Sequence, residues 1–433
     1  MADLAAAASH PSQPRPWGTG VVSLMVTTCS SPLARRTRRM PDASNFGILP
    51  ADMLFDVLLC LPAKDLCRLR VICRPWRSLT SDPLFIKAHT ARHPETLFLA
   101  TFRDNEMHID IMDLSGNVMK RIGIPNDQKV QRTRLDLVCM ATERNSCCVV
   151  NPATGAVHAL PESPAKEHMG CIHLQRPFTS FTFGHVASTG EYKVLRIFNR
   201  PEYFGPGLQL CEAFTINHGA SDAPWRGKQS RDFFVECQEA NSGVVVDGVV
   251  YFLMDSVYDI IGSDIIDGLY PDFICSFDLE TEEWREDIQG PISSNFVWDV
   301  ENAVEEYMSI WNQLSLVELE GYLALVYHRR HQSTMDLWFL TDYDTRSWVK
   351  EYSIQTELII PANGYSVKPL MRPLLVPLVV LNDGRIVIWQ RSTGLMHIYD
   401  PIASTFTEME MRPLAQVGLY TGSPLSLQNS DMV

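Results

Sequence analysis

The sequence predicts an α+β multidomain chain, in which a small all-α helical module precedes an all-β domain of four-stranded, propeller-like blades. Apolar residues recur at helical spacing within short, proline-punctuated segments over residues 49–89. From about residue 94 the helical period ends, and short β-rich runs alternate with turn residues. We therefore divide the 433 residues into a disordered leader, the helical module, the β-domain and a disordered tail, at 1–45, 46–93, 94–420 and 421–433.

The leader is rich in Ala, Ser, Pro and Arg and has almost no acidic residues. This composition is similar to that of an organelle transit peptide. Two plainer interpretations compete with it. The segment is either a disordered leader, which we expect, or it precedes a functional start at Met40.

The helical module opens with an amphipathic pattern. Pro50 suits the first turn of a helix, and Pro62 ends the pattern because the residue before a proline avoids the α region. Between them, one face carries residues at positions i, i+3, i+4 and i+7, namely Leu54, Val57, Leu58 and Leu61. A second apolar surface is formed by Met53, Phe55, Leu59 and Cys60. A helix that is apolar nearly all round is buried on more than one side.

Three shorter segments follow. We expect Asp65 to cap a second helix, Pro75 to begin a third, and Asp82–Pro83 to break the chain before a last apolar run. The second and third carry Leu66, Leu69 and Ile72, and then Trp76 and Leu79. A unit of about 45 residues is marginal as a free domain, so its surplus apolar surface predicts a partner protein.

Four motifs in this order give the module a resemblance: LP at 49–50, LLCLP at 58–62, CRPWRSL at 73–79 and SDPLF at 81–85. The module resembles the F-box, the adaptor-binding module of cullin–RING ubiquitin ligases. The resemblance implies packing against a Skp-family adaptor, which links it to a cullin. The matching positions are Leu49, Pro50, Leu54, Val57, Leu58, Leu61, Pro62, Leu66, Leu69, Val71, Cys73 and Trp76. Some of these would contact the adaptor and others would form the module's own core; the alternative is that all belong to a larger helical core.

Charge and cysteine content narrow the function classes. The net charge of −14 argues against a general nucleic-acid binder. The leader and the module are each basic, so the β-domain carries all of the excess acid, which suits an acidic adaptor of this family. Eleven cysteines without CxxC pairs indicate a reducing compartment. With the ligase role that the resemblance implies, we expect a cytoplasmic and/or nuclear protein. No apolar run reaches the roughly 18 residues of a membrane helix, so no membrane partner is expected.

The β-domain repeats one turn pattern: an apolar strand, an Asp or Asn, a polar turn, and a strand that often begins with an aromatic residue. It occurs at 149–161, 276–284, 341–348 and 398–406, and more weakly at 109–122 and 213–225. Asp or Asn accepts backbone hydrogen bonds in such turns. We place the markers at 113, 151, 217, 278, 344 and 400. Hairpins with Asp-Gly or Glu-Gly turns precede three copies, at 243–253, 316–327 and 379–389.

Two hairpins make four strands, the content of one propeller blade, and we expect six to eight blades. The NPATG run at 151–155 and the later DxxTxxW-like turns are similar to the F-box-associated domain of plant F-box proteins, which is related to kelch propellers. The Gly-Gly pairs of strict kelch repeats are missing. Blade boundaries near 162–212 and 285–315 stay open, and 295–312 is either a helix or a long loop.

Catalytic patterns are not evident. The sequence has no P-loop, no GxGxxG after a strand, no GxSxG and no HExxH. His89 and His93 have metal-compatible helical spacing, but we expect a solvated helix end. His168, Cys171 and His173 lack a fourth ligand, and the acidic run over 280–287 is expected to be solvated. We therefore predict no catalytic residue, no metal and no cofactor.

Loops at one face of a propeller are the expected place for target binding. Two loops combine residue types that are favoured at interfaces, with Arg200, Tyr203 and Phe204 in one and His328, Arg329 and Arg330 in the other. The resemblance implies a non-catalytic substrate-recognition subunit of an SCF-type ubiquitin ligase, which holds a target protein of unknown identity. The alternatives are a propeller scaffold that binds the adaptor without ligase assembly, and a propeller enzyme with an appended helical module.

Overall fold

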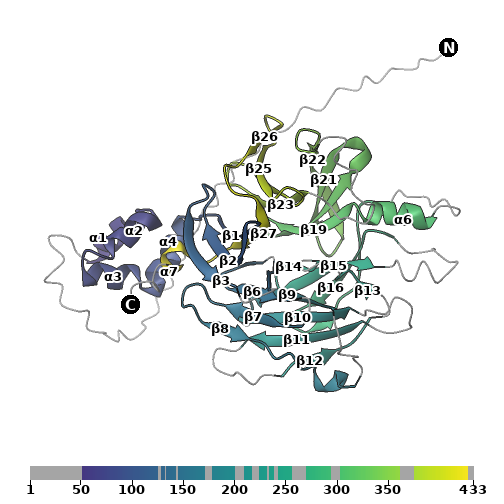
Figure 1. Ribbon diagram of the computed structural model, residues 1–433, viewed down its shortest axis with the longest axis horizontal. Coiled ribbons are helices and arrows are strands. Elements are labelled where there is room, and N and C mark those ends of the chain that lie inside the picture. The colour runs from purple at the N-terminus through teal and green to yellow at the C-terminus, as the bar shows by residue number, and fades with distance from the viewer. Residues whose placement is uncertain are drawn as a thin grey trace, which may run out of the picture. The chain divides into compact units, whose positions relative to one another are not determined.

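The computed structural model describes residues 51–124, 128–131, 133–142, 145–170, 178–199, 209–216, 224–231, 234–237, 242–255, 270–293, 303–360 and 375–427 (Figure 1). The chain divides into two units, Met1–Ala51 and Asp52–Val433, and the description below concerns the second. The leader, Leu49 and Pro50 lie outside the described residues, as do Arg200, Tyr203 and Phe204.

The helical module consists of α1 (Ala51–Leu59), α2 (Ala63–Leu69), α3 (Arg74–Thr80) and α4 (Pro83–Arg92). Proline occupies the first turn of α3 and of α4, where its missing N–H costs nothing. Asp82 caps α4 by accepting a 2.8 Å hydrogen bond from the Leu84 N–H. The expected Asp65 cap is wrong, because α2 begins at Ala63 and Asp65 pairs with Arg68 at 3.3 Å in its first turn.

The β-strands form six sheets, which we number as blades in chain order (Figure 1). Blade 1 contains β27 (Leu414–Tyr420), β1 (Leu97–Phe102), β2 (Asn105–Met112) and β3 (Val118–Gly123), with β5 (Arg134–Leu135) parallel to β27. Blade 2 contains β4 (Lys129–Val130), β6 (Val138–Ala141), β7 (Cys147–Val150) and β8 (Val157–Ala159). Blade 3 contains β9 (Phe178–Val186), β10 (Glu191–Asn199), β11 (Leu210–Ile216) and β12 (Arg226–Lys228).

Blade 4 contains β14 (Val244–Val246), β15 (Val249–Asp255), β16 (Phe273–Asp278) and β17 (Glu283–Trp284), extended by β13 (Phe234–Val235) and β18 (Ile288–Gln289). Blade 5 contains β19 (Leu314–Leu319), β20 (Tyr322–Arg329), β21 (Thr334–Asp342) and β22 (Ser347–Gln355). Blade 6 contains β23 (Leu375–Val380), β24 (Ile386–Gln390), β25 (Leu395–Asp400) and β26 (Thr405–Glu408). The prediction of propeller blades of four strands is confirmed, and their number is six.

Short helices lie between blades, within blade 5 or after the last blade. They are η2 (Lys166–His168), α6 (Ala303–Trp311), η4 (Arg330–Gln332) and α7 (Pro424–Leu427). The described end of the segment 295–312 is therefore a helix. The prediction of a disordered tail over 421–433 is wrong for α7, because the Leu425 and Leu427 side chains are fully buried. None of the helices within the described ranges combines the length and apolarity that a membrane span requires.

The first strands of the blades surround a common axis. β9 contacts β14, β14 contacts β19, β19 contacts β23, and β27 contacts β4. The ring is closed by antiparallel pairing of the first and last long strands of the domain, β1 and β27, from Leu97 opposite Tyr420 to Phe102 opposite Leu414. This pairing removes the exposed sheet edges that an open array would present.

The core of the propeller lies between blades. Because both faces of each blade are covered, its strands are apolar on both faces, and neighbouring residues enter different cores. Cys147 packs with blade 3 side chains such as Phe181, whereas Cys148 packs with blade 1 side chains such as Ile109. The sequence expectation that these two thiols point to opposite faces of a strand is confirmed.

The repeated Asp/Asn turn joins the third and fourth strands of each blade where it is described. The side-chain oxygens of Asn151, Asp278, Asp342 and Asp400 each accept two backbone N–H groups two and three residues later, at 2.7–3.2 Å. Four residues after each marker the backbone has a positive φ, at Gly155, Glu282, Arg346 and Ser404. The marker in blade 5 is Asp342 rather than residue 344, and Asn217 lies outside the described residues.

Tryptophans after these turns connect adjacent blades. The indole N–H of Trp225 donates to the Pro161 carbonyl at 2.7 Å, that of Trp284 to Gln229 at 2.9 Å, and that of Trp348 to Gln289 at 3.0 Å. Each bond runs from the outermost strand region of one blade to the end of the preceding blade. The aromatic residue of the repeat therefore supplies a polar connection between blades as well as apolar packing.

Replacing Trp348 by Phe tests this connection. The substitution keeps an aromatic ring but removes the donor to Gln289, so we expect a loss of about 1 kcal/mol in the free energy of unfolding. Urea denaturation followed by fluorescence of the remaining tryptophans measures it. Tyr399→Phe is the control, because this buried ring packs against Phe406 at 4.9 Å but its hydroxyl donates to no blade carbonyl within the described residues. Equal losses in the two variants would contradict the role of the indole N–H.

A carboxylate links blades 3 and 4. Glu282 receives Arg226 Nη2 at 2.5 Å, Lys228 Nζ at 2.6 Å and Lys193 Nζ at 3.0 Å, although its side chain is only 9 % exposed. Burial would raise the pKa of Glu282, but hydrogen bonds from the three cations outweigh it and lower the pKa to about 2. The expectation that the acidic run over 280–287 is merely solvated is therefore wrong at Glu282.

This cluster predicts acid sensitivity. Because the pKa of Glu282 is lower in the folded chain than in the unfolded chain, its contribution is present above about pH 4.5 and is lost as the pH falls towards 2. Glu282→Gln should cost on the order of 3 kcal/mol at pH 7 and flatten the decline in stability between pH 4.5 and 2. Urea midpoints at pH 7, 4 and 3 for both proteins check this. Parallel pH profiles would show that Glu282 is not the titrating group.

Candidate functional site

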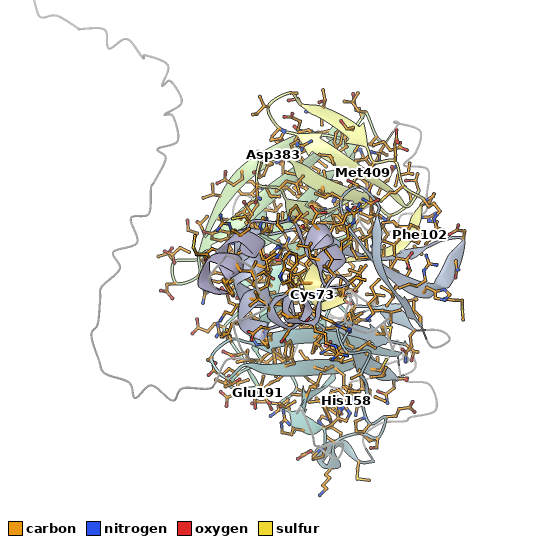
Figure 2. The ribbon with its side chains drawn as sticks, turned by 90° about the vertical axis from the view of Figure 1, so that its left-hand side faces the viewer. Cys73, Phe102, His158, Glu191, Asp383 and Met409 are labelled. Atoms are coloured by element: carbon orange, nitrogen blue, oxygen red, sulfur yellow. The ribbon has the colours of Figure 1, made fainter. Side chains whose placement is uncertain are left out.

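The F-box-like positions of the helical module separate into buried and exposed groups. Leu54, Leu58 and Leu66 are buried, and they share the module's small core with Phe85, which also meets Phe55 edge to face at 5.0 Å. Leu61, Leu69, Cys73 and Trp76 are half-buried; Cys73, labelled in Figure 2, is the residue that precedes α3. Pro62 is exposed, as are Val57 at 51 % and Val71 at 70 %.

The exposed group is larger than the matched positions. Met53 lies one helical turn before Val57 on α1, Ile72 follows Val71 in the α2–α3 turn, and Leu84 lies in the first turn of α4. All of these large apolar side chains are more than half exposed. Because isolated domains rarely leave this much apolar surface in water on so few residues, these positions are the candidate contact surface of the module. Sequence spacing alone could not separate them from the core.

Exposed cations surround this apolar surface. Lys64, Arg68, Arg74, Arg77, Lys87 and Arg92 are exposed. Among the acids with described side chains, Asp56 and Asp82 are exposed and Asp65 is half-buried and pairs with Arg68, so the exposed cations outnumber the exposed acids. The surface of the module is therefore basic, in a chain whose net charge is −14. A basic surface favours encounter with an acidic partner.

His89 of α4 and His93, the residue that follows this helix, hold the end of α1. His89 Nε2 lies 2.9 Å from the Leu61 carbonyl, and His93 Nε2 lies 2.9 Å from the Leu59 carbonyl. Leu59 is the last residue of α1 and Leu61 lies just beyond it, at a helix end that leaves acceptors without intrahelical donors. The two rings stack at 4.5 Å, and His89 is almost fully buried, which lowers its pKa. The expectation of a solvated helix end is therefore wrong, and the pair is a structural cap.

A buried arginine joins α2 to α3 and to the segment after the last blade. Arg70 Nε donates to the Thr80 hydroxyl at 3.1 Å, Nη2 to the Thr80 carbonyl at 2.5 Å, and Nη1 to the Leu425 carbonyl at 2.6 Å. α7 also contacts β3, and Leu427 packs in the core between blades 1 and 2. Arg70 therefore links the helical module to the segment that continues the ring-closing strand.

The basic tip of blade 5 differs from its sequence expectation. His328 is buried, and burial together with the nearby Arg330 lowers its pKa to about 3, so it is neutral. Arg329 pairs with the buried Asp336 at 2.9 Å, and Arg330 donates to the Asn312 carbonyl at 3.3 Å. His328 is therefore a core residue and not part of an exposed loop tip. Arg329 and Arg330 are partly exposed, and each is bonded to a neighbouring residue.

Histidine and acidic side chains do not assemble a metal site in the part of the chain that is described. His168 Nδ1 instead lies 2.8 Å from Glu212 Oε1, while Arg196 binds the other carboxylate oxygen and covers the Trp225 ring at 4.0 Å. Cys171 and His173 lie outside the described residues. The arrangement around Glu212 connects blades 2 and 3, and its carboxylate is fully buried between His168 and Arg196.

A cavity of about 390 Å³ lies on the propeller axis, at the end where the first strands of the blades finish. Its walls come from β5, β9, β14, β19, β23 and β27, and include Leu135, Phe183, Val245 and Leu378. Polar groups are few: Thr133, Arg134, His185, Asp247, Glu318 and Thr421. An apolar cavity with a few convergent polar groups is typical of a binding site. Sequence reasoning missed it, although Asp247–Gly248 and Glu320–Gly321 were recognised as hairpin turns.

Together, the helical module and the six-bladed ring define an F-box protein with a C-terminal β-propeller. Residues 89–417 match the family described as the F-box associated beta propeller domain, and residues 46–90 match the F-box-like family. Since the first match covers most of the chain, the protein belongs to the family of F-box proteins with an F-box-associated propeller, as its sequence resemblance indicated.

Plant relatives agree with this assignment. The Arabidopsis thaliana F-box protein CPR1 is 24% identical over 350 residues, which cover 76% of this chain and 76% of the relative. The A. thaliana F-box protein At3g07870 is 26% identical over 412 residues, covering 83% and 87% respectively. Virginiamycin B lyase of Staphylococcus aureus aligns with 10% identity and a TM-score of 0.37, over 75% of this chain and 87% of that chain, and this similarity says nothing about activity.

The link made by Arg70 predicts a coupled loss of order. Arg70→Ala leaves the Thr80 and Leu425 carbonyls without their donor, so we expect a cost of about 1–3 kcal/mol and faster amide exchange in α7. Hydrogen exchange with mass spectrometry measures the peptide that contains residues 423–427. The matched control is Arg77→Ala, since Arg77 is exposed on α3. Unchanged protection of α7 in the Arg70 variant would rule out the link.

Proposed function

We propose that the protein is the substrate-recognition subunit of an SCF-type ubiquitin ligase. Its helical module binds a Skp-family adaptor, which connects it to a cullin, and its propeller holds a target protein. The observation that supports this best is the apolar surface of the F-box, where Val57, Val71 and Ile72 are half or more exposed. The exposed cations around it complement an acidic adaptor.

The chemistry assigned to the chain itself is positioning. Holding a target near a charged conjugating enzyme converts a bimolecular encounter into an effectively intramolecular one, and it needs no catalytic side chain on the receptor. We therefore assign no covalent step to this chain. We expect it to act in the cytoplasm and/or nucleus, where such ligases act.

Substitution of exposed apolar residues tests adaptor binding. Val57→Asp together with Val71→Asp should lower the affinity for the adaptor by at least tenfold, because each removes apolar contact area and places a carboxylate against an acidic partner. Co-purification and calorimetry with a plant Skp-type adaptor measure the loss. Leu58→Asp is unsuitable, because Leu58 is 2 % exposed and its replacement would unfold the module.

Ile402→Asp is the matched control, since Ile402 is a 92 % exposed apolar residue in a propeller turn. Equal adaptor affinity of the double variant and the wild type would refute the assignment of this surface. Recovery of cullin with the adaptor, and accelerated turnover of a captured target, would separate a working ligase from a scaffold that binds the adaptor alone.

A further inference from the structure

Arg134 bridges three blades across the propeller axis. The short strand β5 pairs in parallel with β27 on its axial side, so that Arg134 reaches the carboxylate of Glu318 on β19 and forms an ion pair. A second guanidinium nitrogen donates to the Leu378 carbonyl of β23 at 2.7 Å. Glu318 also accepts the Gly321 N–H at 2.7 Å, which holds its carboxylate at the cavity wall.

The mouth of this cavity carries excess negative charge. Asp247 and Glu320 occupy equivalent positions in the hairpin turns of blades 4 and 5, each with a positive φ and each followed by a glycine. Both are exposed and have no ion-pair partner among the described residues. Asp247 lines the cavity, and Glu320 precedes the lining residue Gly321. Glu318 and Glu320 act electrostatically on one cation, Arg134, and Asp247 acts on Glu318, so three carboxylates gather near a single positive charge. In blade 6 the corresponding acid, Asp383, is already paired with Arg385 at 2.7 Å.

A buried hydroxyl provides an independent indication of a ligand. Thr133 is 7 % exposed and lines the cavity, but its Oγ1 has no hydrogen-bond partner within the described part of the chain. Buried polar atoms in folded proteins are almost always paired with protein, water or ligand. A hydroxyl of a residue at the cavity wall is a suitable acceptor for an N–H donor.

We propose that this mouth binds a lysine or arginine side chain from a segment of the target protein, with an adjacent apolar residue of that segment in the cavity. The inference rests on the proposed function, since it names the chemistry by which the receptor recognises its target. The volume of about 390 Å³ admits one or two side chains, and the walls contributed by Val244, Val245 and Leu419 are apolar. Asp247 and Glu320 attract the cation, while Glu318 and Thr133 accept its hydrogen bonds.

Charge complementarity makes a basic segment the preferred occupant. An acidic segment would have to displace Glu318 from Arg134 against the repulsion of Asp247 and Glu320. A basic segment keeps the bridge across the axis and neutralises the two exposed carboxylates at the same time. The exposed position of the two turns gives a protein segment access from solvent without rearrangement of the blades.

The test uses the full chain, co-purified with its adaptor, to select binders from a phage-displayed library of random twelve-residue peptides. We expect the enriched peptides to contain Lys or Arg next to an apolar residue. Synthetic copies should lose at least tenfold in affinity when that basic residue is replaced by Ala. The protein variant Asp247→Asn with Glu320→Gln should lose a similar factor, and Asn tolerates the left-handed backbone at residue 247.

The matched control is Asp344→Asn with Glu357→Gln, because both acids are exposed on blade 5 away from the cavity lining. Enriched peptides without a basic residue, equal binding by the Asp247/Glu320 variant, or no enrichment would each overturn the proposal. The thermal midpoint of each variant shows whether its fold is kept. Recovery of the adaptor in the same preparation tests the proposed function separately, so a failure at the cavity is distinguishable from a failure of adaptor binding.

Discussion

Pairing between β1 and β27 is the constraint on which the rest of the structure depends. Each core of the propeller lies between two neighbouring blades, so an open ring would expose the faces of blade 1 that pack against blades 2 and 6. The closing strands are separated by more than 300 residues of sequence, and the entropy of closing so long a loop must be offset by these two cores. The closure also brings the helical module, through α4, and the C-terminal α7 to the same blade. The hydrogen bond between Arg70 and Leu425 is a consequence of this topology.

Polar groups occur at the blade junctions in a consistent way. The apolar layers between blades are non-directional and would tolerate sliding, whereas the Trp284 and Trp348 indoles each have one backbone acceptor on the preceding blade. Glu282 gathers three cations of blade 3, and Arg196 reaches carbonyls of blade 2 from blade 3. These contacts are satisfied only when the blades meet in the native order. Directional bonds therefore specify the ring that hydrophobic burial stabilises.

Local patterns were the part of the fold that sequence could predict. Some turns need only residues within five positions of one another, so a short segment of sequence determines their geometry. These are the turns at Asn151, Asp278 and Asp400 and the hairpin at Asp247–Gly248. The burial of His328 and the cation cluster on Glu282 depend on other strands or blades, and for this reason both were misjudged. The F-box motif predicted the helices correctly, but motif matching could not show that Leu58 is buried and Val57 is exposed. That division depends on which side of α1 meets Phe85 and its neighbours.

The two candidate binding surfaces differ in how they arise, and this explains why only one was evident from sequence. The adaptor surface is local, because 40 or so residues carry more apolar area than their own core can bury, and the excess is visible in the sequence. The axial cavity is assembled from single residues of several blades: Arg134 comes from a strand added inside blade 1, Glu318 from blade 5 and Asp247 from a turn of blade 4. Each of these residues looks like an ordinary exposed charge in its own repeat. Only the ring closure turns them into neighbours, so no single repeat of the sequence identifies the cavity.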